Sequence, residues 1–147
     1  MPVETFKATA HLQQGMVVKA KSRNFEITID EPKSLGGTDE GMNPVELVLC
    51  ALGACQSIVA SVYARKFNID LKDFWVEVEG DLDTDGFMNK SDVRRGYSDI
   101  RYNIHIKTDA AREQVQEFVE FIERTCPVGD TINNPVNLQL NKIIIEA

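Results

Sequence analysis

The longest stretch without a charged side chain, residues 47–64, most constrains the fold of this chain. It is 18 residues long, consists mainly of Ala, Val, Leu, Ile and Cys, and is bounded directly by Glu46 and Arg65. This length reaches the lower limit of a transmembrane helix. Because the stretch also contains Gln56 and several small residues in an otherwise hydrophilic chain, we favour a central helix buried by a sheet or by a partner subunit.

The start of this helix is marked by Asn43 and Pro44. Asn can cap free backbone amides, and Pro at the first helical position loses no hydrogen bond. Glu46 then falls in the first turn. The helical pattern runs over residues 44–67, which is about 36 Å of helix and long enough to cross the body of a small domain.

The rest of the chain alternates in the manner of β-strands or repeats with helical spacing. Residues 31–42 contain Pro32 and three glycines, which predicts a loop. We expect strands at 5–12, 16–21, 25–30, 71–83, 97–108 and 136–146, an amphipathic helix at 109–125 and a short helical turn at 127–134. The order βββ, long α, ββ, α, short α, β predicts an α+β fold, and 147 residues predict one domain, 1–147.

Charge and composition exclude several classes of function. The net charge of −7 argues against a nucleic-acid surface, which needs clustered Lys and Arg. The first residues lack the basic start and apolar core of a secretory signal, so we expect a cytoplasmic protein that does not bind a membrane. In that reducing compartment, a disulfide among three cysteines is expected to be transient and catalytic.

The three cysteines stand in different local settings. Cys126 precedes Pro127, so it can be the N-cap of a helix, where free amides and the helix dipole lower a thiol pKa. An ordinary cysteine at a helix boundary fits the same residues equally well. Cys55 lies in the middle of the apolar helix, where a small buried hydrophobe and a reactive thiol are both consistent with the sequence. Cys50 is about 140° round the helix from Cys55, so we expect it to pack elsewhere.

The sequence contains no metal-binding motif and no cofactor-binding motif. There is no CxxC or HExxH pattern, and His11 and His105 both fall within strand patterns far apart in the chain. We expect both histidines to be half-buried strand residues, and we expect no metal and no cofactor.

Two cysteine motifs together identify a resemblance. Residues 43–47 (NPVEL) followed by 51–55 (ALGAC), and residues 126–128 (CPV) followed by 131–132 (TI), resemble the OsmC/Ohr family of thiol-dependent hydroperoxide reductases. The resemblance covers nearly the whole chain. It implies an OsmC-like fold, with antiparallel sheets around a long buried central helix, in an intertwined homodimer with active sites between subunits.

The resemblance also implies a chemistry. Cys55 would attack a hydroperoxide, organic ones preferentially, and become a sulfenic acid. Cys126 would condense with it to a disulfide, which an external thiol reduces. The expected activity is that of a thiol peroxidase (hydroperoxide reductase) in oxidative stress defence, with Cys55, Cys126 and Glu46 as site residues.

Two features depart from the family pattern. The acidic residue that directly follows the Asn-Pro pair in family enzymes is replaced by Val45, with Glu46 one place later. Family arginines come from a loop ahead of the helix, yet residues 11–15 and 31–42 contain none. These departures favour a second hypothesis, a non-catalytic dimer that binds a small ligand or senses redox state.

Overall fold

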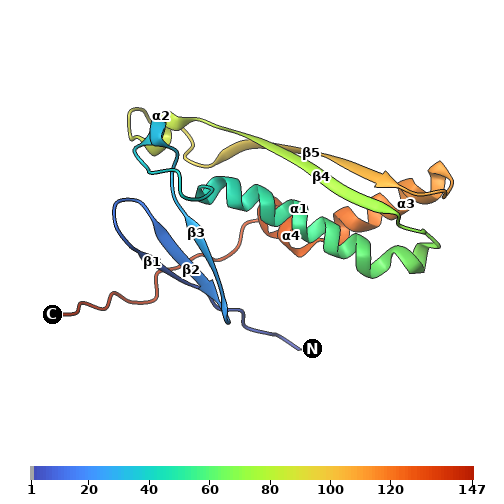
Figure 1. Cartoon of the computed structure of the whole chain (residues 1–147), viewed down its shortest axis with the longest axis horizontal. Coiled ribbons are helices and arrows are strands. Elements are labelled where there is room, and N and C mark those ends of the chain that lie inside the picture. Colours follow the sequence, from blue (N-terminus) through green and yellow to red (C-terminus); the bar gives the residue numbers. More distant parts are fainter. Residues whose placement is uncertain (1) are drawn as a thin grey trace. The chain divides into compact units, whose positions relative to one another are not determined.

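The computed structural model describes residues 2–147 and shows an α+β fold with two antiparallel sheets (Figure 1). The strands are β1 (Thr9–Leu12), β2 (Val18–Ser22), β3 (Phe25–Ile29), β4 (Asp73–Leu82) and β5 (Tyr97–Lys107). The α-helices are α1 (Pro44–Tyr63), α2 (Thr84–Phe87), α3 (Arg112–Thr125) and α4 (Pro127–Asn133), with 3-10 turns at η1 (Lys33–Leu35) and η2 (Ala64–Phe67). The chain divides into two compact units at Cys50 and Ala51, and each is described by itself.

The first unit is a three-stranded meander, as the alternating pattern predicts. Strand β2 pairs with β1 on one side and with β3 on the other, both antiparallel, with Ala20 opposite Ala10 and Ile27. The turn between β2 and β3 holds Arg23 at a positive φ of 57°. These strands confirm the three that the sequence predicts, the first beginning at Thr9 rather than at residue 5 and the other two each one residue shorter than expected.

A buried carboxylate organises the loop that follows β3. Asp30 is 1% exposed and accepts hydrogen bonds from the backbone N–H groups of Glu31, Thr38 and Glu40 and from the Thr38 hydroxyl. Its backbone N–H donates to the carbonyl of Met42 at 3.3 Å. Through its side chain and its backbone N–H, this one residue therefore ties together both ends of the loop between β3 and α1.

Two glycines let this loop pass close to other backbone. A Cβ at Gly37 would lie 1.9 Å from the carbonyl oxygen of Glu31, and one at Gly41 would lie 2.2 Å from that of Thr28. Only a residue without a Cβ fits such an approach without moving backbone. The glycines that predict a loop are therefore required by its path.

Helix α1 begins with a reciprocal cap. The Glu46 N–H donates to Asn43 Oδ1, and the Asn43 N–H donates to Glu46 Oε1, both at 2.9 Å. Asn43 Nδ2 also donates to Glu31 Oε1 at 3.1 Å. This capping box satisfies two backbone donors at the helix start, and it confirms the start signal in the sequence.

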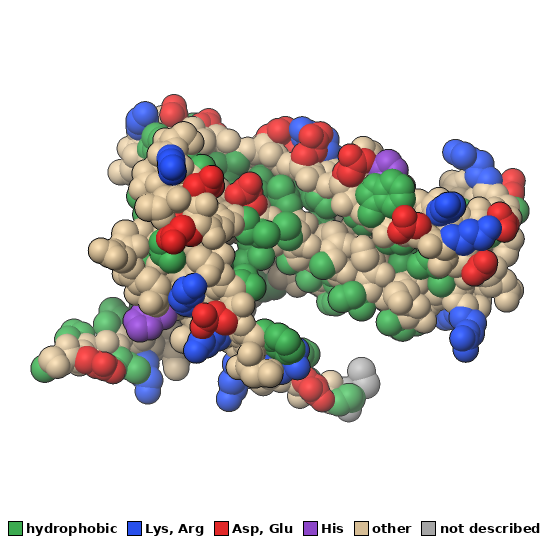
Figure 2. All heavy atoms as spheres, viewed as in Figure 1, with side chains coloured by type: hydrophobic (Ala, Val, Ile, Leu, Met, Phe, Trp, Pro, Cys, Tyr) green, Lys and Arg blue, Asp and Glu red, His purple; other side chains and the backbone are tan. Residues whose placement is uncertain are grey.

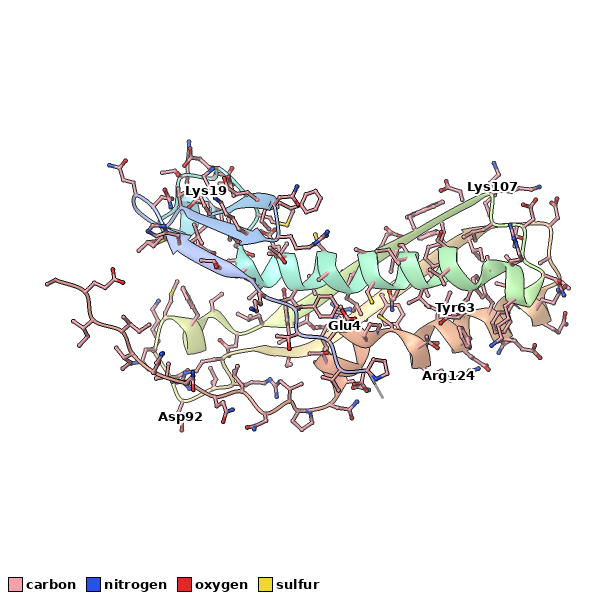
Figure 3. The ribbon with its side chains drawn as sticks, turned by 90° about the horizontal axis from the view of Figure 1, so that it is seen from below. Glu4, Lys19, Tyr63, Asp92, Lys107 and Arg124 are labelled. Carbon is pink, nitrogen blue, oxygen red and sulfur yellow. The ribbon has the colours of Figure 1, made fainter. Side chains whose placement is uncertain are left out.

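The second unit is built around the β4–β5 hairpin, the C-terminal part of α1 and helix α3 (Figure 1). Its core contains Val59, Ala60 and Ala64 from α1 and η2, Ile69, and Phe118 and Ile122 from α3. The ring of Tyr63 on α1 meets that of Phe121 on α3 edge to face at 4.8 Å, and the Arg124 guanidinium lies over the Phe121 ring at 5.1 Å. Figure 3 labels Tyr63 and Arg124. Gly53 faces Val76 and Val78 of β4, so the helix approaches the hairpin closely there.

Much of the long apolar helix is exposed in a single chain. Residues 44–67 are long and apolar enough to cross a membrane by length and composition, and 28% of the most apolar window is buried. Ile58 and Val62 are 63% and 64% exposed. Figure 2 shows hydrophobic side chains at the surface beside the hairpin. The expected burial on all sides is therefore not provided by one copy of the chain.

Two elements differ from the sequence-based prediction. Residues 134–147 contain no strand, so the predicted strand at 136–146 is wrong for this chain. A strand needs a neighbour to pair its backbone groups, and this segment pairs with neither sheet. Conversely, α2 lies between the predicted strands 71–83 and 97–108, where no helix was expected, and the Asp83 side chain caps it by accepting from the Asp85 N–H at 3.0 Å.

Candidate active site

Cys126 sits at the junction of two helices. It follows α3 directly and is the N-cap of α4, with Pro127 at the first helical position. Its Sγ accepts a hydrogen bond from the Gly129 N–H at 3.3 Å, and the residue is 2% exposed. The structure thus confirms the N-cap position that the sequence predicts.

Burial reverses the expected acidity of this thiol. The pKa of Cys126 is raised, first by desolvation, although the N–H groups of Gly129 and Val128 lower it. A hydrogen bond with Cys55 and the negative charge of a Cys55 thiolate raise it further. The prediction that its cap position makes Cys126 acidic is therefore wrong in net effect, because burial outweighs the two backbone donors.

The structure brings Cys55 and Cys126 together. Cys55 projects from the middle of α1, is half-buried and packs against the hydrophobic core of the second unit. It lies close enough to Cys126 to raise the pKa of that thiol through its side chain and its charge. Two thiols 71 residues apart in sequence therefore form one pair.

Three polar side chains line the same cavity as Cys126, and no pattern in the sequence groups them. Tyr102 on β5 donates its hydroxyl proton to Glu123 Oε2 of α3 at 2.7 Å. Gln56 of α1 lies close enough to Tyr102 for its side chain to lower the pKa of that hydroxyl, against larger effects in the opposite direction. Burial and the Glu123 carboxylate raise the pKa of Tyr102 to about 12, so its proton stays in place at neutral pH. The inward alternation of β5 is the one signal that could have placed Tyr102.

A cavity of about 290 Å³ opens beside these groups. Its polar lining comes from Gln56, Tyr102, Glu123 and Asn133, and the thiol side chain of Cys126 also lines it. Its apolar lining comes from Leu52, Ile100 and Ile132. The cavity is therefore a mixed polar and apolar site next to one member of the thiol pair.

The other charged candidates are engaged elsewhere. The Glu46 carboxylate caps α1, nine residues ahead of Cys55 in sequence. Arg101, adjacent to Tyr102, donates to Glu79 at 2.7 Å and to Asp81 at 2.8 and 3.1 Å. Successive residues of a strand point to opposite faces, so Arg101 lies on the face away from Tyr102.

The remaining cysteine and the two histidines have contacts of their own. Cys50 is exposed rather than packed, with its Sγ 3.7 Å from Met42 Sδ. His11 is exposed on β1, whereas the prediction was half-buried. His105 is half-buried as predicted, stacks on Trp75 with ring centroids 4.6 Å apart, and contacts Glu77.

Comparison with known proteins identifies the family of this chain. The model of the OsmC-like protein family matches residues 37–141, which include both cysteines of the pair. The chain belongs to the OsmC-like family. That assignment confirms the resemblance carried by the two cysteine motifs.

Relatives of this OsmC-like protein agree in extent and fold. A protein of Mycoplasma genitalium named hydroperoxide reductase is 28% identical over 137 residues, or 92% of each chain. A protein of Mycoplasma pneumoniae with the same name is 27% identical, again over 92% of each chain. The crystal structure of an OsmC-like protein from Mycoplasma pneumoniae is similar with a TM-score of 0.79 and 26% identity, covering 90% of this chain and 89% of that one.

Proposed function

We propose that this OsmC-like protein reduces hydroperoxides, with Cys55 as the attacking thiol and Cys126 as the resolving thiol. The observation that carries the proposal is the proximity of these two thiols in the second unit, where Cys55 raises the pKa of Cys126. The names of the two Mycoplasma relatives support the same reaction. The apolar packing around Cys55 favours organic hydroperoxides over hydrogen peroxide.

The cycle has two oxidative steps. The Cys55 thiolate attacks one oxygen of the hydroperoxide, the O–O bond breaks, and the other oxygen leaves as an alcohol after taking a proton, which gives a Cys55 sulfenic acid. The Cys126 sulfur then attacks the Cys55 sulfur and displaces water, forming the Cys55–Cys126 disulfide. Two equivalents of an external thiol return both cysteines to the reduced state.

The effect of Cys55 on the pKa of Cys126 is consistent with Cys55 as the attacking thiol and Cys126 as the resolving thiol. A Cys55 thiolate raises the pKa of Cys126 by its charge and by the hydrogen bond between them. Oxidation of Cys55 to a neutral sulfenic acid removes that charge, so the pKa of Cys126 falls when its thiolate is needed. The Gly129 N–H, 3.3 Å from Cys126 Sγ, then stabilises the thiolate.

We also propose that the protein works as a homodimer in the cytoplasm, where thiols are kept reduced. The exposed face of α1, with Ile58 and Val62, is an apolar surface that a second copy would cover. The C-terminal segment exposes Leu138 at 92% and Ile145 at 90% and alternates apolar and polar residues, so it could pair as a strand with that copy. Sedimentation should therefore give about twice the chain mass of 16.5 kDa.

The test of the reaction is a peptide map. Reduced protein treated with one equivalent of cumene hydroperoxide should lose two thiols and give a peptide linked through Cys55 and Cys126. The Cys126→Ser variant should instead retain a sulfenic acid on Cys55 that a dimedone probe labels. Both thiols remaining free after prolonged treatment would contradict the proposal.

The third cysteine provides the matched control. Cys50→Ser should consume hydroperoxide at the wild-type rate, whereas Cys55→Ser should lose nearly all of it. Equal consumption by the wild type and Cys55→Ser would instead favour the non-catalytic alternative, in which the cavity beside Cys126 holds a ligand without turnover.

A further inference from the structure

Formation of the proposed disulfide requires the Cys126 thiol to lose its proton inside the protein. The residue is 2% exposed, and burial raises the pKa of its thiol. The thiolate is the form of cysteine that attacks another sulfur. A thiol that bulk water hardly reaches therefore needs a neighbouring group to take its proton.

Glu123 is the one carboxylate among the described residues that line the cavity beside Cys126. It stands three residues before Cys126, whose N–H still donates to the Ile122 carbonyl at 3.0 Å, as in a continuing helix. Side chains three residues apart lie on the same side of a helix. Because Glu123 is also exposed, it can exchange a proton with bulk water.

The Tyr102 hydroxyl is close to both of these groups. It donates to Glu123 Oε2 at 2.7 Å. Tyr102 lines the same cavity as Cys126, and it lies close enough for a charge on that sulfur to raise its pKa. Since the single hydroxyl proton goes to Glu123, the Tyr102 oxygen meets its other neighbours as an acceptor.

Tyr102 does not act as a base by itself. Its pKa is raised to about 12, so it keeps its proton at neutral pH. Its oxygen can therefore receive a proton only while it passes its own proton to Glu123. Such a transfer leaves Tyr102 neutral before and after, and it moves one proton from a buried sulfur to an exposed carboxylate.

We propose that Glu123, acting through the Tyr102 hydroxyl, takes the proton of the Cys126 thiol as Cys126 attacks the oxidised Cys55. Tyr102 is then a catalytic residue of the resolving step, and Glu123 is the positioning residue behind it. The inference rests on the proposed function, because it concerns the second oxidative step of that cycle. It goes further by assigning two residues that lie outside both cysteine motifs.

The proton transfer accompanies formation of the disulfide. The Cys126 proton moves to the Tyr102 oxygen as the Tyr102 proton moves to Glu123 Oε2. The electron pair left on the Cys126 sulfur forms the bond to the Cys55 sulfur, and the S–O bond of the sulfenic acid breaks, with its pair leaving on hydroxide. The Cys126 sulfur is oxidised and the Cys55 sulfur is reduced. The hydroxide and the proton that Glu123 releases make up the one water produced.

The test measures the resolving step separately from the attack on peroxide. The parent protein is Cys50→Ser, in which Cys55 and Cys126 are the two cysteines that remain of three. It is mixed rapidly with enough cumene hydroperoxide to make the attack faster than the resolving step. Samples are quenched with a strained-alkyne probe for sulfenic acid and analysed by peptide mass spectrometry, so that the fall of labelled Cys55 gives the resolving rate.

We expect Glu123→Gln and Tyr102→Phe each to slow the resolving step about a hundredfold at pH 7, the size of a general-base contribution. Glu123→Gln keeps an acceptor for the Tyr102 hydroxyl, so loss of that hydrogen bond would not explain the effect. Glu117→Gln is the matched control. It removes an exposed carboxylate from the same helix, outside the cavity lining, and should resolve at the parent rate.

The pH profile distinguishes a proton acceptor from a structural residue. The titratable groups that line the cavity or act on the Cys126 pKa are Cys55 of α1, Tyr102 of β5 and Glu123 of α3. On α4, Asp130 accepts from Asn134 Nδ2 at 2.9 Å. The parent resolving rate should change less than twofold from pH 6 to pH 8, because the protein supplies the acceptor. In Glu123→Gln, hydroxide must remove the proton, so the rate should rise about tenfold per pH unit.

Two outcomes overturn this inference alone, provided that Cys55 is labelled in the parent protein. They are equal resolving rates for Glu123→Gln and Glu117→Gln at pH 7, and a parent rate that rises about tenfold per pH unit. The second outcome uses only the parent protein, so it holds even if a variant fails to fold. Absence of labelled Cys55 and of disulfide in the parent would instead overturn the proposed function, and this inference with it.

Discussion

Two buried polar side chains, one in each unit, have opposite hydrogen-bonding states. Asp30 in the first unit is 1% exposed and accepts four hydrogen bonds from its own loop. Gln56 in the second unit is 2% exposed, and its Oε1 accepts none within the described chain. The comparison separates a carboxylate that holds its own loop in place from an amide whose oxygen has no hydrogen-bond donor among the described residues, although both are almost fully buried.

The largest expected effect is on the group with complete hydrogen bonds. Asp30→Ala removes an acceptor from three backbone N–H groups and one hydroxyl, which leaves buried donors unpaired. We expect the melting temperature to fall by about 10 °C. Calorimetry of the wild type and the variant measures the fall. A change of less than a degree or two would show that the loop does not depend on this side chain.

Acid should act on the same group. The hydroxyl of Thr38 and three backbone N–H groups lower the pKa of Asp30 to about 2, below its ordinary value of 3.8. The carboxylate therefore stabilises the fold above pH 4, and this contribution is lost as the pH falls from about 4 to about 2.

Measurement against Asp30→Asn isolates this contribution from other carboxylates. The difference in unfolding free energy between the wild type and Asp30→Asn should be constant from pH 7 to pH 5 and should shrink below pH 4. A difference that stays constant down to pH 2 would contradict the lowered pKa.

A smaller effect is expected at the cap of α1. Glu46→Ala breaks one half of the capping box with Asn43 and should lower the free energy of unfolding by about 1 kcal/mol. Glu46→Gln can still accept from the Asn43 N–H, so it should cost less. Urea denaturation compares the two variants.

The same pair tests a catalytic role for Glu46. If the charge of Glu46 contributes to peroxide reduction, Glu46→Gln will slow the oxidation of Cys55 while leaving stability nearly unchanged. Equal oxidation rates for Glu46→Gln and the wild type would restrict Glu46 to capping.

The smallest effect on stability is expected from substitution of Gln56. Gln56→Met loses the interaction with Tyr102 but also removes a buried oxygen that has no donor among the described residues. The two changes oppose each other, so we expect the variant to be neutral to more stable, by at most about 2 kcal/mol. A loss of more than about 2 kcal/mol in urea denaturation would show that Gln56 belongs to the fold, as Asp30 does.

The sequence predicted what depends on local patterns. The meander, the long helix from Pro44, the hairpin β4–β5 and the N-cap position of Cys126 all follow from alternation, helical spacing or a capping signal. The strand predicted at 136–146 has the right alternation, but its formation depends on a partner that no pattern within the segment identifies.

The site depended on contacts that the sequence does not show. The motifs indicated the two cysteines, but the raised pKa of Cys126 comes from burial at a junction of α3 and α4. Gln56 was visible only as a polar residue in an apolar run. Gln56, Tyr102 and Glu123 come from α1, β5 and α3 and line one cavity. Their proximity is visible only in the folded second unit.

The close approach of Gly37 and Gly41 to backbone carbonyls also restricts how this protein can vary. A library that randomises residues 31–42 should recover almost only glycine at these two positions, because any Cβ there meets a backbone oxygen. At Gly15 a Cβ would meet nothing within 4 Å, and the φ of 64° is one that Asn tolerates. Amino-acid substitutions in the first unit should therefore accumulate in the turn before β2, while the loop ahead of α1 keeps its length and its glycines.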